Sequence, residues 1–118
     1  MKKLLFILAI VCGSLTFAQD WQYIGGEGVL GSATEVAIAR GSNGTLFTVR
    51  KTASSVIVSK WTGTAWDDLP SVVNSFGKSN IQLTIIDDDT PVVSYNTSSN
   101  LVSMRYYNGT AFTTIPGI

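Results

Sequence analysis

The sequence lacks histidine altogether and contains a single cysteine, Cys12, among its 118 residues. Without histidine, the chain has neither the commonest general base nor the commonest metal ligand of proteins. Catalytic arrangements that pair histidine with serine or cysteine are therefore excluded within this chain. An enzyme would have to rely on carboxylates, tyrosine or lysine. We therefore expect a non-enzymatic protein with no catalytic residue, no metal and no cofactor.

Charged residues are also scarce, at 14% of the chain, and the two signs are balanced. No basic stripe is present that could neutralise a run of phosphates, as nucleic-acid binding requires. We therefore expect no nucleic-acid partner. After residue 18, no apolar run approaches the roughly 20 residues that a membrane-spanning helix needs, so we expect no membrane span.

The first 20 residues, MKKLLFILAIVCGSLTFAQD, have the organisation of a secretory signal peptide. Two lysines precede an apolar run, and small residues follow up to Ala18. Cleavage after Ala18 predicts a signal peptide over 1–18 and a bacterial protein that is secreted, periplasmic or on the cell surface. A lipid anchor on Cys12 is disfavoured because Val11 stands where a small residue is usually needed. The mature chain then has no cysteine, so burial and strand pairing must stabilise it without disulfides.

A repeat runs through the rest of the chain. The segment WTGTAW starts at Trp61, and YNGTAF starts 46 residues later at Tyr107. Trp66 follows Trp21 at a spacing of 45 residues, and Phe112 follows Trp66 at a spacing of 46. One inserted residue near position 100 accounts for the difference. Periods of this size are typical of repeat architectures.

Each repeat unit contains four segments with the pattern of short β-strands. Apolar residues alternate with polar or small ones, and β-branched and aromatic residues dominate. Asn43-Gly44 and Asn108-Gly109 supply the positive φ that tight hairpins require. No segment after residue 19 shows the helical period of about 3.6 residues. We expect one all-β domain over 19–118, with units at about 21–66 and 66–112 and a last strand to residue 118.

Four antiparallel strands in a unit of about 45 residues match a β-propeller blade. The predicted fold is all-β, with two four-stranded antiparallel propeller-like blades that form part of a larger or oligomeric propeller. Propellers typically have about four to eight blades, so two blades leave two apolar faces open. A ring of identical chains, a longer array of which this chain is a shortened piece, or a face-to-face sandwich of the two units would each cover these faces.

The order of strands and turns resembles the repeats of exported bacterial β-propeller proteins, in which a strand such as PVVSY precedes an aromatic residue, a glycine turn and tryptophan. A weaker similarity is to fucose-binding lectins that form six-bladed propellers, some of them from two-blade chains that trimerise. Those lectins hold the sugar with an arginine, a glutamate on the next strand and a stacking tryptophan. The resemblance implies these roles for Arg50 and for Trp61 or Trp66. The strand VIVSK carries no acid, however, and Tyr95 replaces the arginine in the second unit, so the fucose site is not reproduced.

Aromatic side chains beside the turns are the best candidates for contact with a ligand, because their flat faces stack on sugars or on peptide side chains. We expect Trp66 and Phe112 to pack inside the repeat, since an aromatic residue recurs at that position. Trp61, Tyr106 and Tyr107 remain as candidates. Tyr106 and Tyr107 are adjacent, so in a strand they point to opposite faces.

The predicted ligand-binding residues are Trp61, Tyr107 and Tyr106, with Arg50 and Arg105 as polar neighbours. The function that we expect is an exported, non-enzymatic binding module of propeller type that recognises a glycan or a protein surface. The alternative is a purely structural repeat of a larger or oligomeric propeller, without a small-molecule ligand. A homo-oligomer that closes the propeller ring is the partner expected in either case.

The segment 87–89, with three consecutive aspartates, is the one dense acidic cluster, and its oxygen atoms would suit Ca²⁺. The aligned residues of the first unit, 42–44, have the sequence of a plain hairpin turn. The spacing also lacks the alternating ligands and distal glutamate of an EF-hand loop. We expect a solvated turn here and no metal site.

Overall fold

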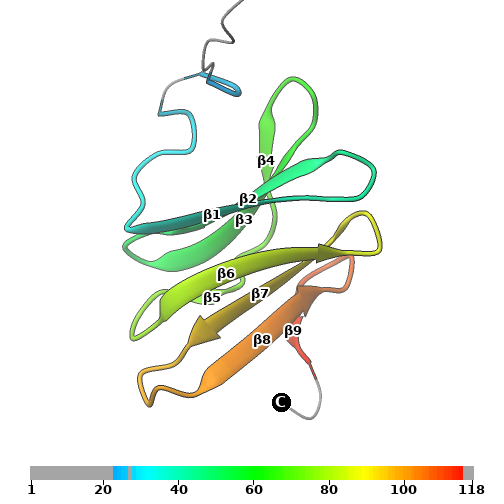
Figure 1. Ribbon diagram of the computed structural model, residues 1–118. Coiled ribbons are helices and arrows are strands. Elements are labelled where there is room, and N and C mark those ends of the chain that lie inside the picture. The colour runs from blue at the N-terminus through cyan, green and yellow to red at the C-terminus, as the bar shows by residue number, and fades with distance from the viewer. Residues whose placement is uncertain (1–22, 27, 116–118) are drawn as a thin grey trace, which may run out of the picture.

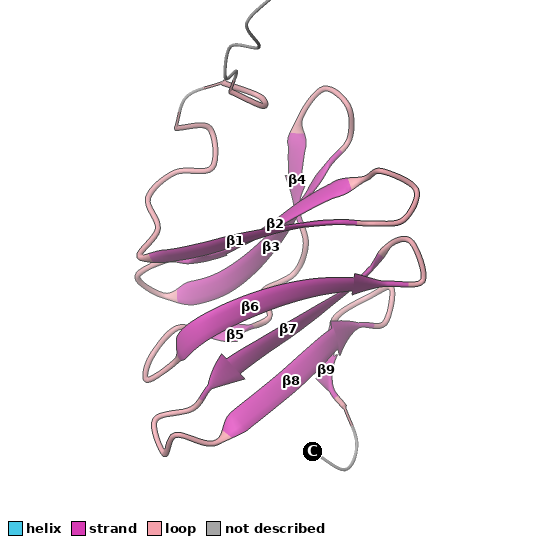
Figure 2. Ribbon diagram, in the orientation of Figure 1, coloured by secondary structure: helices cyan, strands magenta, loops and turns pink. Residues whose placement is uncertain are grey.

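The computed structural model describes residues 23–26 and 28–115. The predicted signal peptide over 1–18, Trp21 and the end of the last predicted strand lie outside the described residues. Within them, all regular structure is β-strand and no helix is present (Figure 2). The all-β prediction is therefore confirmed. In the same part of the chain, no helix has the length and apolar character to cross a membrane.

The strands form two antiparallel sheets, one after the other along the chain (Figure 1). Sheet A contains β1 (Glu35–Arg40), β2 (Leu46–Lys51), β3 (Ser55–Trp61), β4 (Trp66–Asp68) and β5 (Val73–Asn74). Sheet B contains β6 (Ser79–Ile86), β7 (Thr90–Asn96), β8 (Val102–Tyr107) and β9 (Phe112–Thr114). Neighbours in sequence pair in both sheets, and the short β5 adds a second pairing to β3. Sheet A therefore has one strand more than the four expected.

The two sheets share one pairing register. The residues that lie opposite one another on the first three strands are Ile38, Thr48 and Ser59 in sheet A, and Leu83, Val93 and Arg105 in sheet B. The offset is 45 residues for the first two strands and 46 for the third. The extra residue falls in the β7–β8 turn, where Asn100 has a φ of 59°. The repeat seen in the sequence is thus a repeat of strand pairing.

The core lies between the sheets. The side chains of the main buried cluster are Phe47, Val49, Val56 and Val58 from sheet A, Val72 from the connection, and Ile81, Val93, Tyr95 and Phe112 from sheet B. Strand β6 lies against β1 and β2 of the other sheet. The described residues contain no cysteine, so no disulfide joins the two sheets. Hydrophobic burial is therefore the main favourable contribution to the free energy of folding.

Polar contacts also join the two sheets. A carboxylate oxygen of Glu35 accepts a hydrogen bond from the backbone N–H of Ile81 at 3.0 Å. The Lys60 ammonium lies 3.0 Å from a carboxylate oxygen of Asp89. These contacts tie β1 and β3 of sheet A to β6 and to the β6–β7 turn of sheet B.

Side chains alternate between the two faces of each strand, and the matched faces of the two sheets have different surroundings. We call the face of sheet A that carries Ile38, Thr48 and Ser59 the outer face of sheet A; it points away from sheet B. The matched face of sheet B carries Leu83 and Val93 and packs on sheet A. The two sheets thus have the same orientation along the stack. The outer face of sheet A is open, whereas the matched face of sheet B is covered by sheet A.

Candidate functional site

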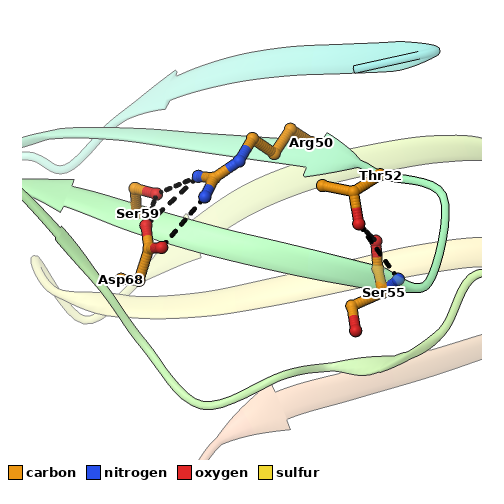
Figure 3. Close-up of polar contacts among 5 residues, drawn as sticks. All are labelled: Arg50, Thr52, Ser55, Ser59 and Asp68. Carbon is orange, nitrogen blue, oxygen red and sulfur yellow. Dashed lines mark hydrogen bonds and ion pairs between the residues drawn. The ribbon is translucent and has the colours of Figure 1, made fainter. Parts of the chain in front are cut away.

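Arg50 on β2 is enclosed by polar groups of the next strands of sheet A. Its guanidinium donates to Ser59 Oγ at 2.6 Å and to the two carboxylate oxygens of Asp68 at 2.9 and 3.2 Å (Figure 3). The Ser59 hydroxyl donates to the same carboxylate at 2.5 Å. The three residues lie side by side on β2, β3 and β4, so the sheet itself positions them. Only 8% of Arg50 is exposed, and its guanidinium is directed at these partners.

The hydrogen bond from Arg50 holds the pKa of the Asp68 carboxyl below its ordinary value. Partial burial opposes this shift, while the Ser59 hydroxyl and the charge of Arg50 support it. The ion pair therefore stays formed at neutral pH. Arg50 Nε and Thr48 Oγ1 are buried and have no hydrogen-bond partner among the described residues.

Arg105 on β8 has a different role. Its guanidinium donates to the backbone carbonyl of Val72 at 3.1 Å, which ties sheet B to the connection that leaves sheet A. In the repeat, Arg105 stands at the position of Ser59 rather than that of Arg50. Both arginines predicted to contact a ligand are thus engaged within the fold.

The two aromatic motifs are hairpins with a cross-strand ring pair. Trp61 lies opposite Trp66, with ring centroids 5.3 Å apart and planes inclined by 55°. Tyr107 lies opposite Phe112 at the same centroid distance, with planes inclined by 43°. Tilted aromatic pairs of this kind are worth about 0.5–1.5 kcal/mol beyond the area that they bury. The motifs WTGTAW and YNGTAF therefore repeat a packing unit.

Residues 23–26 lie over the tryptophan pair of sheet A. Trp66 Nε1 donates to the backbone carbonyl of Ile24 at 2.9 Å. Gly25 has a φ of +84°, and a Cβ built there would approach both indole rings at 3.1 Å. Trp61 and Trp66 are half-buried, and Gly25 lies against both rings. In sheet B, Phe112 is buried, and Tyr107 donates through its hydroxyl to its own turn, at Gly109 O.

A polar cleft of about 500 Å³ lies where the β6–β7 and β8–β9 turns approach the end of sheet A. We define the cleft by its functional side chains, which are Lys60, Asp87, Asp89, Tyr106, Tyr107 and Asn108. The two turns that contribute most of these residues lie side by side in Figure 1, in yellow and in orange to red. Aromatic rings, an amide and charged groups of both signs therefore meet in one open cleft.

Charge and backbone conformation shape one wall of the cleft. Lys60 pairs with Asp89, whereas Asp87 forms no ion pair among the described residues. Asp87 and Asp88 have φ values of 48° and 66°, in the left-handed region that aspartate tolerates better than most residues. Backbone N–H of Asp89 donates to Asp87 O at 2.7 Å and closes the turn. The wall is negatively charged and has a defined conformation.

The structure separates the five residues predicted to bind a ligand. Tyr106 and Tyr107 both line the cleft. Trp61 lies elsewhere, beneath residues 23–26, and Arg50 and Arg105 are occupied within the fold. The prediction therefore corresponds to at least two places in the molecule, and only the tyrosines share an open one.

Four polar residues of the cleft were not among the predicted ligand-binding residues: Lys60, Asp87, Asp89 and Asn108. The available signal was their position, since each stands at a strand end or in a turn next to the repeated aromatic motifs. Sequence alone does not show that turns of two different sheets meet. In the described part of the chain, no group of three or more acidic or cysteine side chains is arranged to hold a metal ion.

No protein-family model matches the chain, and no curated protein or solved structure matches it either.

Proposed function

We propose that this chain is an exported, non-enzymatic carbohydrate-binding protein whose sugar site is the polar cleft. The observation that carries the proposal is the convergence of two adjacent tyrosines with a lysine, two aspartates and an asparagine in one open cleft. A sugar offers apolar C–H faces and a rim of hydroxyl groups. Tyrosine rings suit the former, and charged or amide groups make strong hydrogen bonds with the latter.

The proposal includes a propeller-type architecture and export. Two features support the architecture: the common pairing register of the sheets, and the way in which each sheet presents the same face in the same direction. The signal-peptide pattern of residues 1–18 supports export. Ligand sites of repeat proteins often lie in the turns at one end of the strands, since loops on a rigid scaffold carry function, and the cleft is built in this way.

A screen of the mature chain, from residue 19 onward, on an array of mono- and oligosaccharides tests the function. We expect binding to at least one sugar, and we expect Tyr106→Ala to weaken it by tenfold or more. Tyr23→Ala is the matched control, because Tyr23 is an exposed tyrosine outside the cleft. Absence of binding to every sugar, or equal affinity of Tyr106→Ala and the parent chain, would contradict the proposal.

A second candidate function is a purely structural repeat, and a specific observation favours it. The tryptophan pair is covered by residues 23–26, and Arg50 and Arg105 are hydrogen-bonded inside the fold. If the conspicuous side chains all serve packing, the array gives no signal, and Tyr106→Ala lowers the stability of the fold without any effect on sugar binding.

A further inference from the structure

The outer face of sheet A exposes apolar side chains on β1, the edge strand of the sheet. Val36 and Ile38 on β1 are 73% and 62% exposed. Together with Leu30 and Ala33 they line a mostly apolar hollow of about 320 Å³. Large apolar side chains that are exposed together around one hollow are typical of an interaction surface.

The chain contains its own template for what covers this face. The residues of sheet B at the same repeat positions as Val36 and Ile38 are Ile81 and Leu83. Both pack into the core against the inner face of sheet A. The same face of the same repeat is therefore covered in sheet B and open in sheet A. What covers it in sheet B is the opposite face of another repeat unit.

We propose that a second copy of this chain covers the outer face of sheet A with the free face of its own sheet B, in a head-to-tail contact. The free face of sheet B, on the side away from sheet A, is the one that carries Val92, Met104 and Tyr106. Neighbouring side chains of the same sheet leave Val92 only 6% exposed, and Met104 and Tyr106 are half-buried. These residues stand at the repeat positions of Phe47, Val58 and Lys60, which cover sheet B inside the chain. The contact joins two different surfaces, so every copy keeps one of each free for a further copy unless a ring closes.

The charges agree with this contact. Inside the chain, Lys60 pairs with Asp89 across the two sheets. At the repeat positions that would meet between copies, Tyr106 replaces the lysine and Gly44 replaces the aspartate. Both charges are missing together, so these two positions would bury no unpaired charge, which is the costly outcome in an interface. Arg50 and Asp68 on the same face are already paired, and Arg40 at the end of β1 is the exposed charge that the contact must leave in solvent.

The contact between copies should be weaker than the internal one. The free face of sheet B carries Gln82, Thr84 and Ser94 where the inner face of sheet A carries alanine and valine. Less apolar area would therefore leave water. We expect association that depends on protein concentration, as sedimentation velocity over a range of concentrations would show.

Cross-linking between two cysteine variants tests the direction of the contact. Inside the chain, Lys51 Nζ of sheet A donates to Lys78 O beside sheet B at 2.5 Å. The repeat counterparts of Lys51 and Lys78 are Asn96 and Ala33, so these two positions should be close together across the contact between copies. The chain from residue 19 onward has no cysteine, so Ala33→Cys and Asn96→Cys each introduce a single thiol. We expect a short bis-maleimide to link the two variants when they are mixed, and to link neither variant efficiently to itself. Linking of Ala33→Cys to itself at the level of the mixture would overturn the head-to-tail direction.

Substitution of the face tests its role. Ile38→Asp should convert the associated form into monomer without loss of fold, since the side chain is exposed in the single chain. Phe76→Asp is the matched control: Phe76 is 87% exposed but lies in the β5–β6 turn, and this variant should associate like the parent. A parent chain that stays monomeric at all concentrations, or association that survives Ile38→Asp unchanged, would refute the proposal. Tyr106 borders both the cleft and this contact, whereas Ile38 lies outside the cleft. Sugar binding is therefore measured on Ile38→Asp: retained binding in a monomer, or association without any sugar binding, separates the two proposals.

Discussion

Sheets A and B pair their strands in the same register, yet they use polar side chains differently. Sheet A holds a network of Arg50, Ser59 and Asp68 on its outer face. The matched positions of sheet B are Tyr95, Arg105 and Thr114. In sheet B the arginine therefore stands one strand later, on β8 at the position matched to Ser59. It donates to the backbone carbonyl of Val72, in the connection from sheet A.

The difference follows from what lies against each face. The matched face of sheet B packs on sheet A, so Tyr95 contributes a ring to the core. No sheet of the described residues covers the outer face of sheet A, and the ion pair there stays partly hydrated, with Asp68 52% exposed. The repeat thus preserves backbone pairing, while the neighbour of each face selects its side chains.

Phe47→Ala should have the largest effect on stability. Phe47 is buried between the sheets, and removal of a buried phenylalanine ring costs about 3–5 kcal/mol of the free energy of unfolding. Val92→Ala, at the matched position of sheet B, removes fewer carbons from a side chain that is 6% exposed and faces away from sheet A, and it should cost about 1–2 kcal/mol. Urea denaturation measures both. Equal losses of stability would contradict the view that the core between the sheets contributes more than the free face of sheet B does.

Arg50→Met should destabilise the chain by about 1–3 kcal/mol, because it leaves Ser59 and Asp68 without their charged donor. Arg105→Met removes a single hydrogen bond to a carbonyl and should cost about 1 kcal/mol. The same denaturation experiment ranks the two variants. A larger loss of stability for Arg105→Met would contradict the view that the Arg50 network stabilises the fold more than the hydrogen bond of Arg105 does.

Trp66→Phe tests how residues 23–26 are held. The substitution keeps a ring opposite Trp61, as Phe112 does in sheet B, but removes the hydrogen bond to Ile24 O. We expect a loss of about 0.5–1.5 kcal/mol and faster proteolysis near residue 24. Trp61→Phe is the control, since the indole N–H of Trp61 makes no hydrogen bond among the described residues. Equal proteolysis of the two variants would contradict the view that the hydrogen bond from Trp66 to Ile24 holds residues 23–26 in place.

Asp68→Asn should change the acid sensitivity of the fold by the smallest amount. The pKa of Asp68 is lowered in the folded chain, below an unfolded value of about 3.9. Its contribution to stability is therefore present above that value and is lost as the pH falls through the lower folded pKa. The side chain is 52% exposed, so solvent screening keeps the effect small.

Denaturation midpoints between about pH 5 and pH 2 measure this effect. The parent chain should lose more stability over that range than Asp68→Asn does. Asp67→Asn is the control, because Asp67 forms no ion pair among the described residues, and it should follow the parent. A parallel decline of the parent and Asp68→Asn would show that the carboxylate does not contribute.

The strands were predictable from sequence because their signal is local. Alternating apolar residues mark β1 and β6, and the Gly-containing turns mark where the strands end. The recurring aromatic position predicted packing for Trp66 and Phe112, but their ring partners Trp61 and Tyr107 were predicted to contact a ligand. β5 was not predicted, since two residues pairing with β3 carry too little pattern to be recognised.

The sites were less predictable because they depend on contacts between distant segments. The partner of Arg50 is Asp68, 18 residues away, and the second unit offers no matching pair to reveal it. The cover over Trp66 comes from residue 24, whose sequence shows only a flexible glycine-rich connection. The cleft combines two turns of sheet B with Lys60 of sheet A, and only the packing of the two sheets brings them together.

The most direct test of the proposed sugar site is ¹H–¹⁵N chemical-shift mapping of the mature chain with the sugar that the array identifies. We expect the shifts to concentrate at Lys60, at residues 87–89 and at residues 106–109, and to leave Val36 and Ile38 unchanged. Shifts centred on the outer face of sheet A, or no saturable shift with any sugar, would contradict the assignment of the cleft as the ligand site.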